Sequence, residues 1–174
     1  KAEVDREIAI KKQAQDEAQA ALDRLKAQKE SLEANKAEEI SANDTLEKEK
    51  EISAEKKYQA QLATEAAKMS NASWQIENGS AAEVEEGRRI YKGHTRRASK
   101  ITRDYNQNLA SLHATHDSNE AEINSKYAKS ENDITEAIAA QTKVVEKATK
   151  AADEAAKGRQ KAINDALAQD KEYK

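Results

Sequence analysis

Histidines and carboxylates spaced to share a metal ion occur at one place in the sequence, residues 113–120. His113, His116, Asp117 and Glu120 lie within two helical turns, and the pairs His113–Asp117 and His116–Glu120 are spaced i,i+4. This spacing brings side chains to one helix face, where imidazole and carboxylate groups could hold a divalent cation. The segment contains no HExxH motif and no third ligand can be placed beside either pair. We therefore expect a solvated helix face and no metal site.

No other arrangement of side chains predicts catalysis. The chain has no Cys, and neither a glycine-rich phosphate loop nor a Ser-His-Asp order is present. Large apolar residues are too few to enclose a dry pocket that would shift a carboxylate pKa toward catalysis. The sequence predicts a protein with no enzymatic activity, no catalytic residues and no cofactor.

Trp74 is the single tryptophan and lies in the densest cluster of Ser, Asn and Gly residues, between positions 70 and 93. Residues of these types interrupt helices. We expect Trp74 to close the end of a helical hairpin by packing against Ile76, Val84 and Ile90. The alternative is an exposed recognition residue, because Trp is a favoured anchor of protein interfaces.

A basic segment lies beside this cluster, since seven basic residues and no acid occur between Arg88 and Arg103. We expect Glu83, Glu85 and Glu86 to neutralise the segment across the turn. The alternative is a surface for a host receptor, a sulfated glycan, phosphate or anionic lipid. A nucleic-acid partner is not expected, because the sequence pI is about 5.8 and no aromatic ladder accompanies the arginines. The candidate recognition residues are Trp74, Arg88, Arg89, Lys92, Arg96 and Arg97.

Three N-glycosylation sequons are present, at Asn43, Asn71 and Asn78. Asn71 and Asn78 lie in the expected tip, where an exposed loop would permit glycosylation. Asn43 lies in the middle of an expected helix and is the weaker candidate.

The composition is that of a helical protein. The 174 residues include no Pro and no Cys, Ala is the commonest residue, and charged residues make up 36% with a net charge of −3. An Ala-, Glu- and Lys-rich chain of this kind is typical of long helices and coiled coils. Its near-balanced charge argues against disorder, which usually accompanies high net charge.

The spacing of apolar residues predicts an all-α fold, an elongated antiparallel helical hairpin or coiled-coil bundle. We expect one domain over 1–174, with long helices at 1–69 and 95–172 and a tip at 70–94. Within the tip, Ser80 and Glu83 form a capping-box pattern, which predicts a short separate helix from Ala81 to Tyr91. Polar residues in the seam of the second helix predict fixed alignment of the helices, and they are Asn108, His116, Asn119, Ser130 and Gln141.

An Ala- and Glu-rich, Cys-free hairpin with a glycine-bearing tip resembles the glutamate/alanine-rich surface coat proteins of African trypanosomes. The resemblance covers the whole chain and rests on composition and on the helices flanking Ser70–Gly93. It implies a parasite coat protein, glycosylated and held by a glycosylphosphatidylinositol anchor, with a helical bundle like the core of variant surface glycoproteins.

Two functions are the main expectations, and a cytosolic coiled-coil spacer is the third. The first is a non-enzymatic coat protein on the extracellular face of the plasma membrane, attached through a lipid anchor outside this fragment, with its tip pointing away from the membrane. The second is the receptor-binding coiled-coil hairpin of a bacterial toxin or adhesin. Oligomers could form through coiled-coil contacts in either case.

Overall fold

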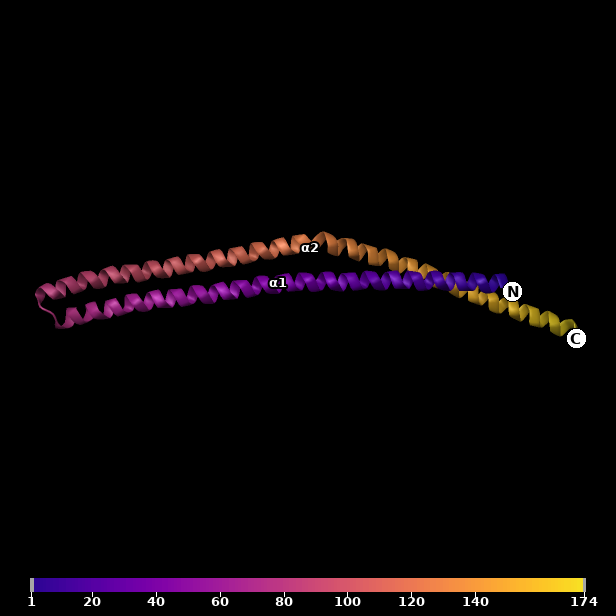
Figure 1. Ribbon diagram of the computed structural model, residues 1–174, viewed down its shortest axis with the longest axis horizontal. Coiled ribbons are helices and arrows are strands. Elements are labelled where there is room, and N and C mark those ends of the chain that lie inside the picture. The colour runs from indigo at the N-terminus through magenta and orange to yellow at the C-terminus, as the bar shows by residue number, and fades with distance from the viewer. Residues whose placement is uncertain (1, 174) are drawn as a thin grey trace. The chain divides into compact units, whose positions relative to one another are not determined.

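The computed structural model describes residues 2–173, and every described residue except Gly79 and Ser80 is helical. Helix α1 spans Ala2–Asn78 and helix α2 spans Ala81–Tyr173. Figure 1 shows α1 leading into the turn and α2 returning from it beside α1, so that the two helices are antiparallel at the turn. The expected all-α class, with two long helices packed against each other, is confirmed, and the described residues contain no strand.

The helices form because the sequence contains no proline and is rich in strong helix formers. Side chains four residues apart support the exposed faces, as in the Glu7–Lys11 ion pair and the Gln19–Asp23 hydrogen bond. Each such contact adds only a few tenths of a kcal/mol, so packing of one helix on the other must supply most of the stability.

The tip differs from the sequence-based expectation. α1 continues through Ser70 and Asn71 to Asn78, and α2 continues from Ala81 past Tyr91 without a break, so no separate short helix is present. Ser and Asn cost a helix well under 1 kcal/mol each, which the flanking helix formers offset. The helices are therefore joined by Gly79 and Ser80 alone.

The turn is held by local hydrogen bonds. The Gly79 amide donates to the Gln75 carbonyl, and the Val84 amide donates to the Ser80 carbonyl. Ser80 caps α2 as expected, because its hydroxyl accepts from the Glu83 amide. The Glu83 carboxylate accepts from the Ser80 hydroxyl, whereas a full capping box would have it accept from the Ser80 amide. A Cβ on Gly79 would lie 2.6 Å from the Gln75 carbonyl oxygen, which explains why the turn requires glycine.

The chain divides into two compact units, each built from a segment of both helices. The terminal unit comprises Lys1–Ala37 and Ser125–Lys174, and the turn unit comprises Glu38–Asn124. The boundaries expected at 69–70 and 94–95 coincide with neither a helix end nor a unit limit.

In the terminal unit the helix segments meet through small and aliphatic residues. Ala18 and Leu22 are its buried apolar residues. Gln141 donates to the Ala18 carbonyl at 2.9 Å, and two ion pairs, Lys36–Glu131 and Asp5–Arg159, also join the segments. From residue 156 to residue 170, Ile163 is the one side chain that is not exposed.

In the turn unit polar groups occupy the interface between the helices. Asn43, Glu65 and His94 are buried there, together with Ala72. Tyr58 stacks on Tyr105 with ring centroids 4.1 Å apart and the ring planes 8° from parallel. The two helix segments of the turn unit therefore bury few apolar side chains, and polar side chains make up most of what is buried between them.

Candidate functional site

The end of the turn unit exposes its tryptophan. Trp74 is 64% exposed, so the expectation that it packs into the hairpin end is wrong. The cause is helical geometry. α1 is still helical at this point, and Trp74 follows the buried Ala72 by two positions, or about 200° around the helix axis. Its side chain therefore stays outside the buried interface and lies at the edge where the two helices meet.

Small residues fill the hairpin end in its place. Gly87 is buried, and a Cβ there would lie 3.0 Å from the Ala72 carbonyl oxygen and 3.1 Å from Ile76. Val84 and Ile90 are half-buried beside them. This close approach of the helices leaves no space between them for an indole ring.

Trp74 instead forms one wall of a shallow groove of about 510 Å³ on the flank of the turn unit. The groove combines apolar and polar side chains from both helices. Its lining residues are Lys68, Asn71, Ala72, Trp74, Gln75, Ile90 and His94. Gly93 is on the same flank, since it lies three positions after Ile90, and no heavy atom lies within 4 Å of where its Cβ would be.

The basic segment is also exposed. Arg88, Lys92, Arg96 and Arg97 are all exposed, and none of them has an ion pair among the described residues. Arg97 and Lys100 continue the stripe of Ile90 and Gly93 at helical spacing, about 10 and 15 Å further along α2 than Ile90.

The expected neutralisation across the turn is absent from the described contacts. Glu83 bonds the capping residue Ser80, and Glu86 pairs with Arg89 within α2 at i,i+3. The hydrogen bond from Arg89 lowers the pKa of Glu86 and raises that of Arg89. Arg89 is thus the one residue of the candidate recognition set whose charge is locally matched.

The three sequons fall in different surroundings. Asn71 is exposed and lines the groove beside Trp74. Asn78 is exposed, and its side-chain amide donates to the Trp74 carbonyl. Asn43 is buried, and its amide donates to the His116 carbonyl at 3.1 Å. A glycan on Asn43 would need the helices to separate, so Asn71 and Asn78 are the accessible candidates.

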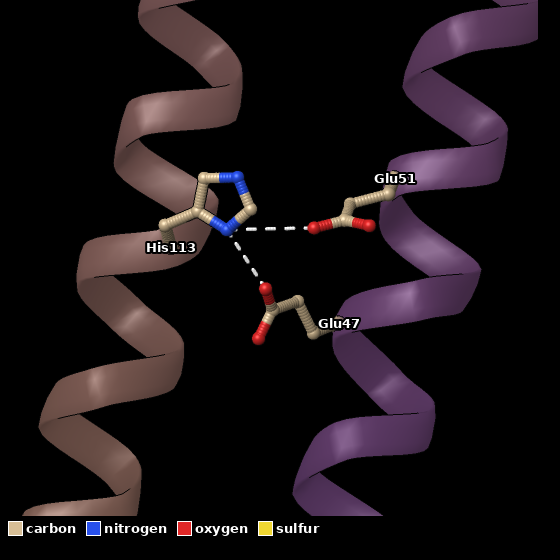
Figure 2. Close-up of side chains that lie close together, drawn as sticks. All are labelled: Glu47, Glu51 and His113. Carbon is tan, nitrogen blue, oxygen red and sulfur yellow. Dashed lines mark hydrogen bonds and ion pairs between the residues drawn. The ribbon is translucent and has the colours of Figure 1, made fainter.

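A second polar cluster joins the two helices at the end of the turn unit that lies away from Gly79 and Ser80. Figure 2 shows His113 of α2 pointing toward Glu47 and Glu51 of α1. The His113 Nδ1 atom lies 2.8 Å from a Glu47 carboxylate oxygen and 3.4 Å from one of Glu51. The sequence-based search found no third ligand for His113, because these carboxylates are more than sixty residues away in the chain.

His116 lies one turn further along α2 and contacts carboxylates with both ring nitrogens. Its Nε2 is 2.6 Å from Asp44, and its Nδ1 is 2.8 Å from Glu47 and 3.3 Å from Asp117. The Asp44 hydrogen bond is the largest cause of a raised His116 pKa, and partial burial opposes it. The surrounding carboxylates therefore favour the imidazolium form of His116 more than water does.

A third histidine forms a buried pair. His94 Nδ1 bonds the Glu65 carboxylate, and both side chains are only 11% exposed. Sequence spacing gives no signal for this pair, because its members lie on different helices. The i,i+4 spacing places His113 near Asp117 and His116 near Glu120. The shortest contacts of the two histidines are instead with carboxylates of α1, from His113 to Glu47 and from His116 to Asp44. Asp117 and Glu120 still lie close to His116.

Comparison with known proteins finds no relative of this chain. No family model matches the chain, and no curated protein and no solved structure matches it. In the described part of the chain, neither helix has a stretch long and apolar enough to cross a membrane.

Proposed function

We propose that the protein is a non-enzymatic binding module that contacts a receptor protein with the Trp74 flank of its turn unit. The observation that carries this proposal is the 64% exposure of Trp74 in a groove that the Lys68 side chain also lines. Tryptophan and arginine are the residue types most enriched among interface hot spots.

The chemistry of the flank indicates the partner. An indole ring and the half-buried Ile90 offer apolar area, and Arg97 and Lys100 add positive charge on the same side. A complementary protein surface would present an apolar recess bordered by carboxylates. The flank is carried by helices whose turn is fixed by the Ser80 cap, so little conformational entropy is lost on binding.

The test is binding of the fluorescently labelled chain to a panel of intact bacterial and animal cells. We expect saturable binding that is lost after the cells are treated with trypsin. Trp74→Ala should weaken it at least tenfold, since a hot-spot residue contributes about 2 kcal/mol or more. Leu167→Ala, which removes an equally exposed apolar side chain from the terminal unit, is the matched control and should leave it unchanged.

Other outcomes would overturn the proposal. Binding that resists trypsin but is lost after heparinase treatment would indicate a sulfated glycan. Equal binding to phosphatidylserine vesicles would indicate an anionic membrane. Absence of saturable binding to every cell type, with helicity intact by circular dichroism, would remove the receptor hypothesis altogether.

The second candidate is the glycosylated surface coat protein, which the exposure of the Asn71 and Asn78 sequons favours. This proposal includes a cell-surface location and a lipid anchor outside the fragment. A glycan at Asn71 would cover the groove beside Trp74, so the two proposals conflict at this residue. The intact mass of the protein from its natural source separates them, because a mass excess mapped to Asn71 supports the coat protein.

A further inference from the structure

We propose that Glu47, Glu51 and His113 form a binding site for a divalent transition-metal ion, of which Zn²⁺ is the best probe, that joins α1 to α2 within the turn unit. The site is separate from the Trp74 flank and does not depend on the proposed receptor binding.

The donor set is the first argument. One imidazole nitrogen and two carboxylate oxygens lie close enough together to contact a single ion. Nitrogen and oxygen donors suit Zn²⁺, Co²⁺ and Ni²⁺, whereas Ca²⁺ and Mg²⁺ prefer oxygen alone. Three protein ligands leave one position for water, which is a common arrangement of zinc.

The distances are the second argument. Donors of a tetrahedral zinc ion, each bonded at about 2.0–2.1 Å, lie roughly 3.3 Å from one another. The two measured separations from His113 Nδ1, 2.8 and 3.4 Å, bracket that value. Replacing the hydrogen bond by a metal ion therefore needs movements of about half an ångström by the two half-buried glutamate side chains.

The charge balance is the third argument. Glu47 and Glu51 lie four residues apart on one helix face, where like charges repel. His113 Nδ1 can donate one proton at most, so it cannot satisfy both carboxylates at once. A divalent cation would neutralise both carboxylates.

His116 supplies the outer support that metal ligands usually have. One oxygen of Glu47 faces His113, and the other is 2.8 Å from His116 Nδ1. This contact orients the Glu47 carboxylate while its first oxygen stays available to the ion. Such outer contacts typically change metal affinity by about 10- to 100-fold.

The test is titration of the full chain with ZnCl₂, followed by calorimetry, and with CoCl₂, followed by visible absorption. We expect one saturable site, a Co²⁺ spectrum of low coordination number, and a melting temperature raised on the order of 5 °C at saturation. An excess of Mg²⁺ or Ca²⁺ should not displace Zn²⁺.

Variants locate the ion. His113→Ala and Glu51→Gln should each lower Zn²⁺ affinity at least tenfold, and His116→Gln should lower it about tenfold while keeping one site. Glu49→Gln, an exposed glutamate between the two ligands on α1, is the matched control and should change nothing.

Two results would overturn the site. Zn²⁺ binding that survives His113→Ala but disappears in His116→Gln would place the ion on His116, Asp117 and Glu120, the neighbouring cluster. A chain that shows no saturable Zn²⁺ binding while circular dichroism reports full helicity would exclude both.

Discussion

The turn unit and the terminal unit use segments of the same two helices but hold them together with different chemistry. The turn unit buries Asn43, Glu65 and His94 between its helices, whereas the terminal unit buries Ala18 and Leu22. Two-helix interfaces are too thin to exclude water completely, and the described chain has no large side chain that is fully buried. In such an interface, paired polar groups can fix the alignment of helices that apolar area alone holds weakly.

The two units also differ in the kinds of side chain that could serve a function. All three histidines of the sequence lie in the turn unit, as do Trp74 and the candidate metal ligands. The terminal unit joins its helices mainly through small side chains and a few polar links. The predictions below test this division, beginning with the largest expected effect.

Breaking the buried pair of the turn unit should have the largest effect. His94→Ala leaves the Glu65 carboxylate buried without its partner, which should lower the free energy of unfolding by about 3 kcal/mol. Urea unfolding followed by circular dichroism measures the loss. Replacing both residues by Leu should recover most of it, and a double variant as unstable as His94→Ala would contradict a pairing role.

The glycines should respond in opposite directions in the two units. Gly87→Ala places a Cβ 3.0 Å from the Ala72 carbonyl oxygen and should destabilise the turn unit by about 1–3 kcal/mol. Gly158→Ala meets no atom within 4 Å and should stabilise the terminal unit by up to about 1 kcal/mol. Thermal unfolding of both variants checks the signs, and equal effects would show that the helices do not approach closely at Gly87.

Two substitutions of Tyr58 should separate the contribution of its hydrogen bond to Thr102 from that of its stacking on Tyr105. Tyr58→Phe keeps the stacking on Tyr105 and removes the hydrogen bond to Thr102, so it should cost about 1 kcal/mol. Tyr58→Leu also removes the stacked ring and should cost more. The urea concentrations at the midpoint of unfolding rank the two variants by stability. Identical midpoints would mean that stacking of the two rings does not stabilise the turn unit.

The pH dependence should come from the turn unit. The His116 pKa is raised above its ordinary 6.5, first by the Asp44 hydrogen bond. Its stabilising effect is therefore complete below pH 6.5 and is lost as the pH rises through the raised pKa. The charged groups around His116 are Asp44, Glu47, Lys50, Asp117 and Glu120.

Hydrogen exchange from pH 6 to 9, corrected for the intrinsic exchange rate, follows each unit separately. Protection in the turn unit should fall across this window, and His116→Gln should flatten the dependence. A fall of equal size in the terminal unit, which has no histidine, would contradict this assignment.

The smallest effect is expected at the surface of the terminal unit. Asp5 and Arg159 form an ion pair whose side chains are about half exposed. Arg159→Ala should change the free energy of unfolding by about 0.5 kcal/mol or less, because exposed ion pairs are weak. Thermal unfolding at low and high salt checks this, and a large, salt-sensitive loss would show that charge also matters in this unit.

Local rules in the sequence were enough to predict two long helices and the cap at Ser80, but not that both helices continue through the expected tip at 70–94. The absence of proline and the abundance of Ala, Glu and Lys fix the helical state, and Ser80 with Glu83 marks the start of α2. Three of the expected alignment residues, His116, Asn119 and Gln141, do bond the opposite helix. Asn108 and Ser130 are exposed instead, because the seam wraps around the helix and a residue's face cannot be assigned from a single spacing.

By itself, the sequence determined which residues are helical, because helix propensity and capping act between near neighbours. The tertiary structure decided which side chains meet. Continuation of α1 to Asn78 turned Trp74 outward, and the alignment of α1 on α2 brought Glu47 and Glu51 to His113. Both outcomes depend on the rotation and register of one helix against the other, which are set by contacts between residues far apart in the chain.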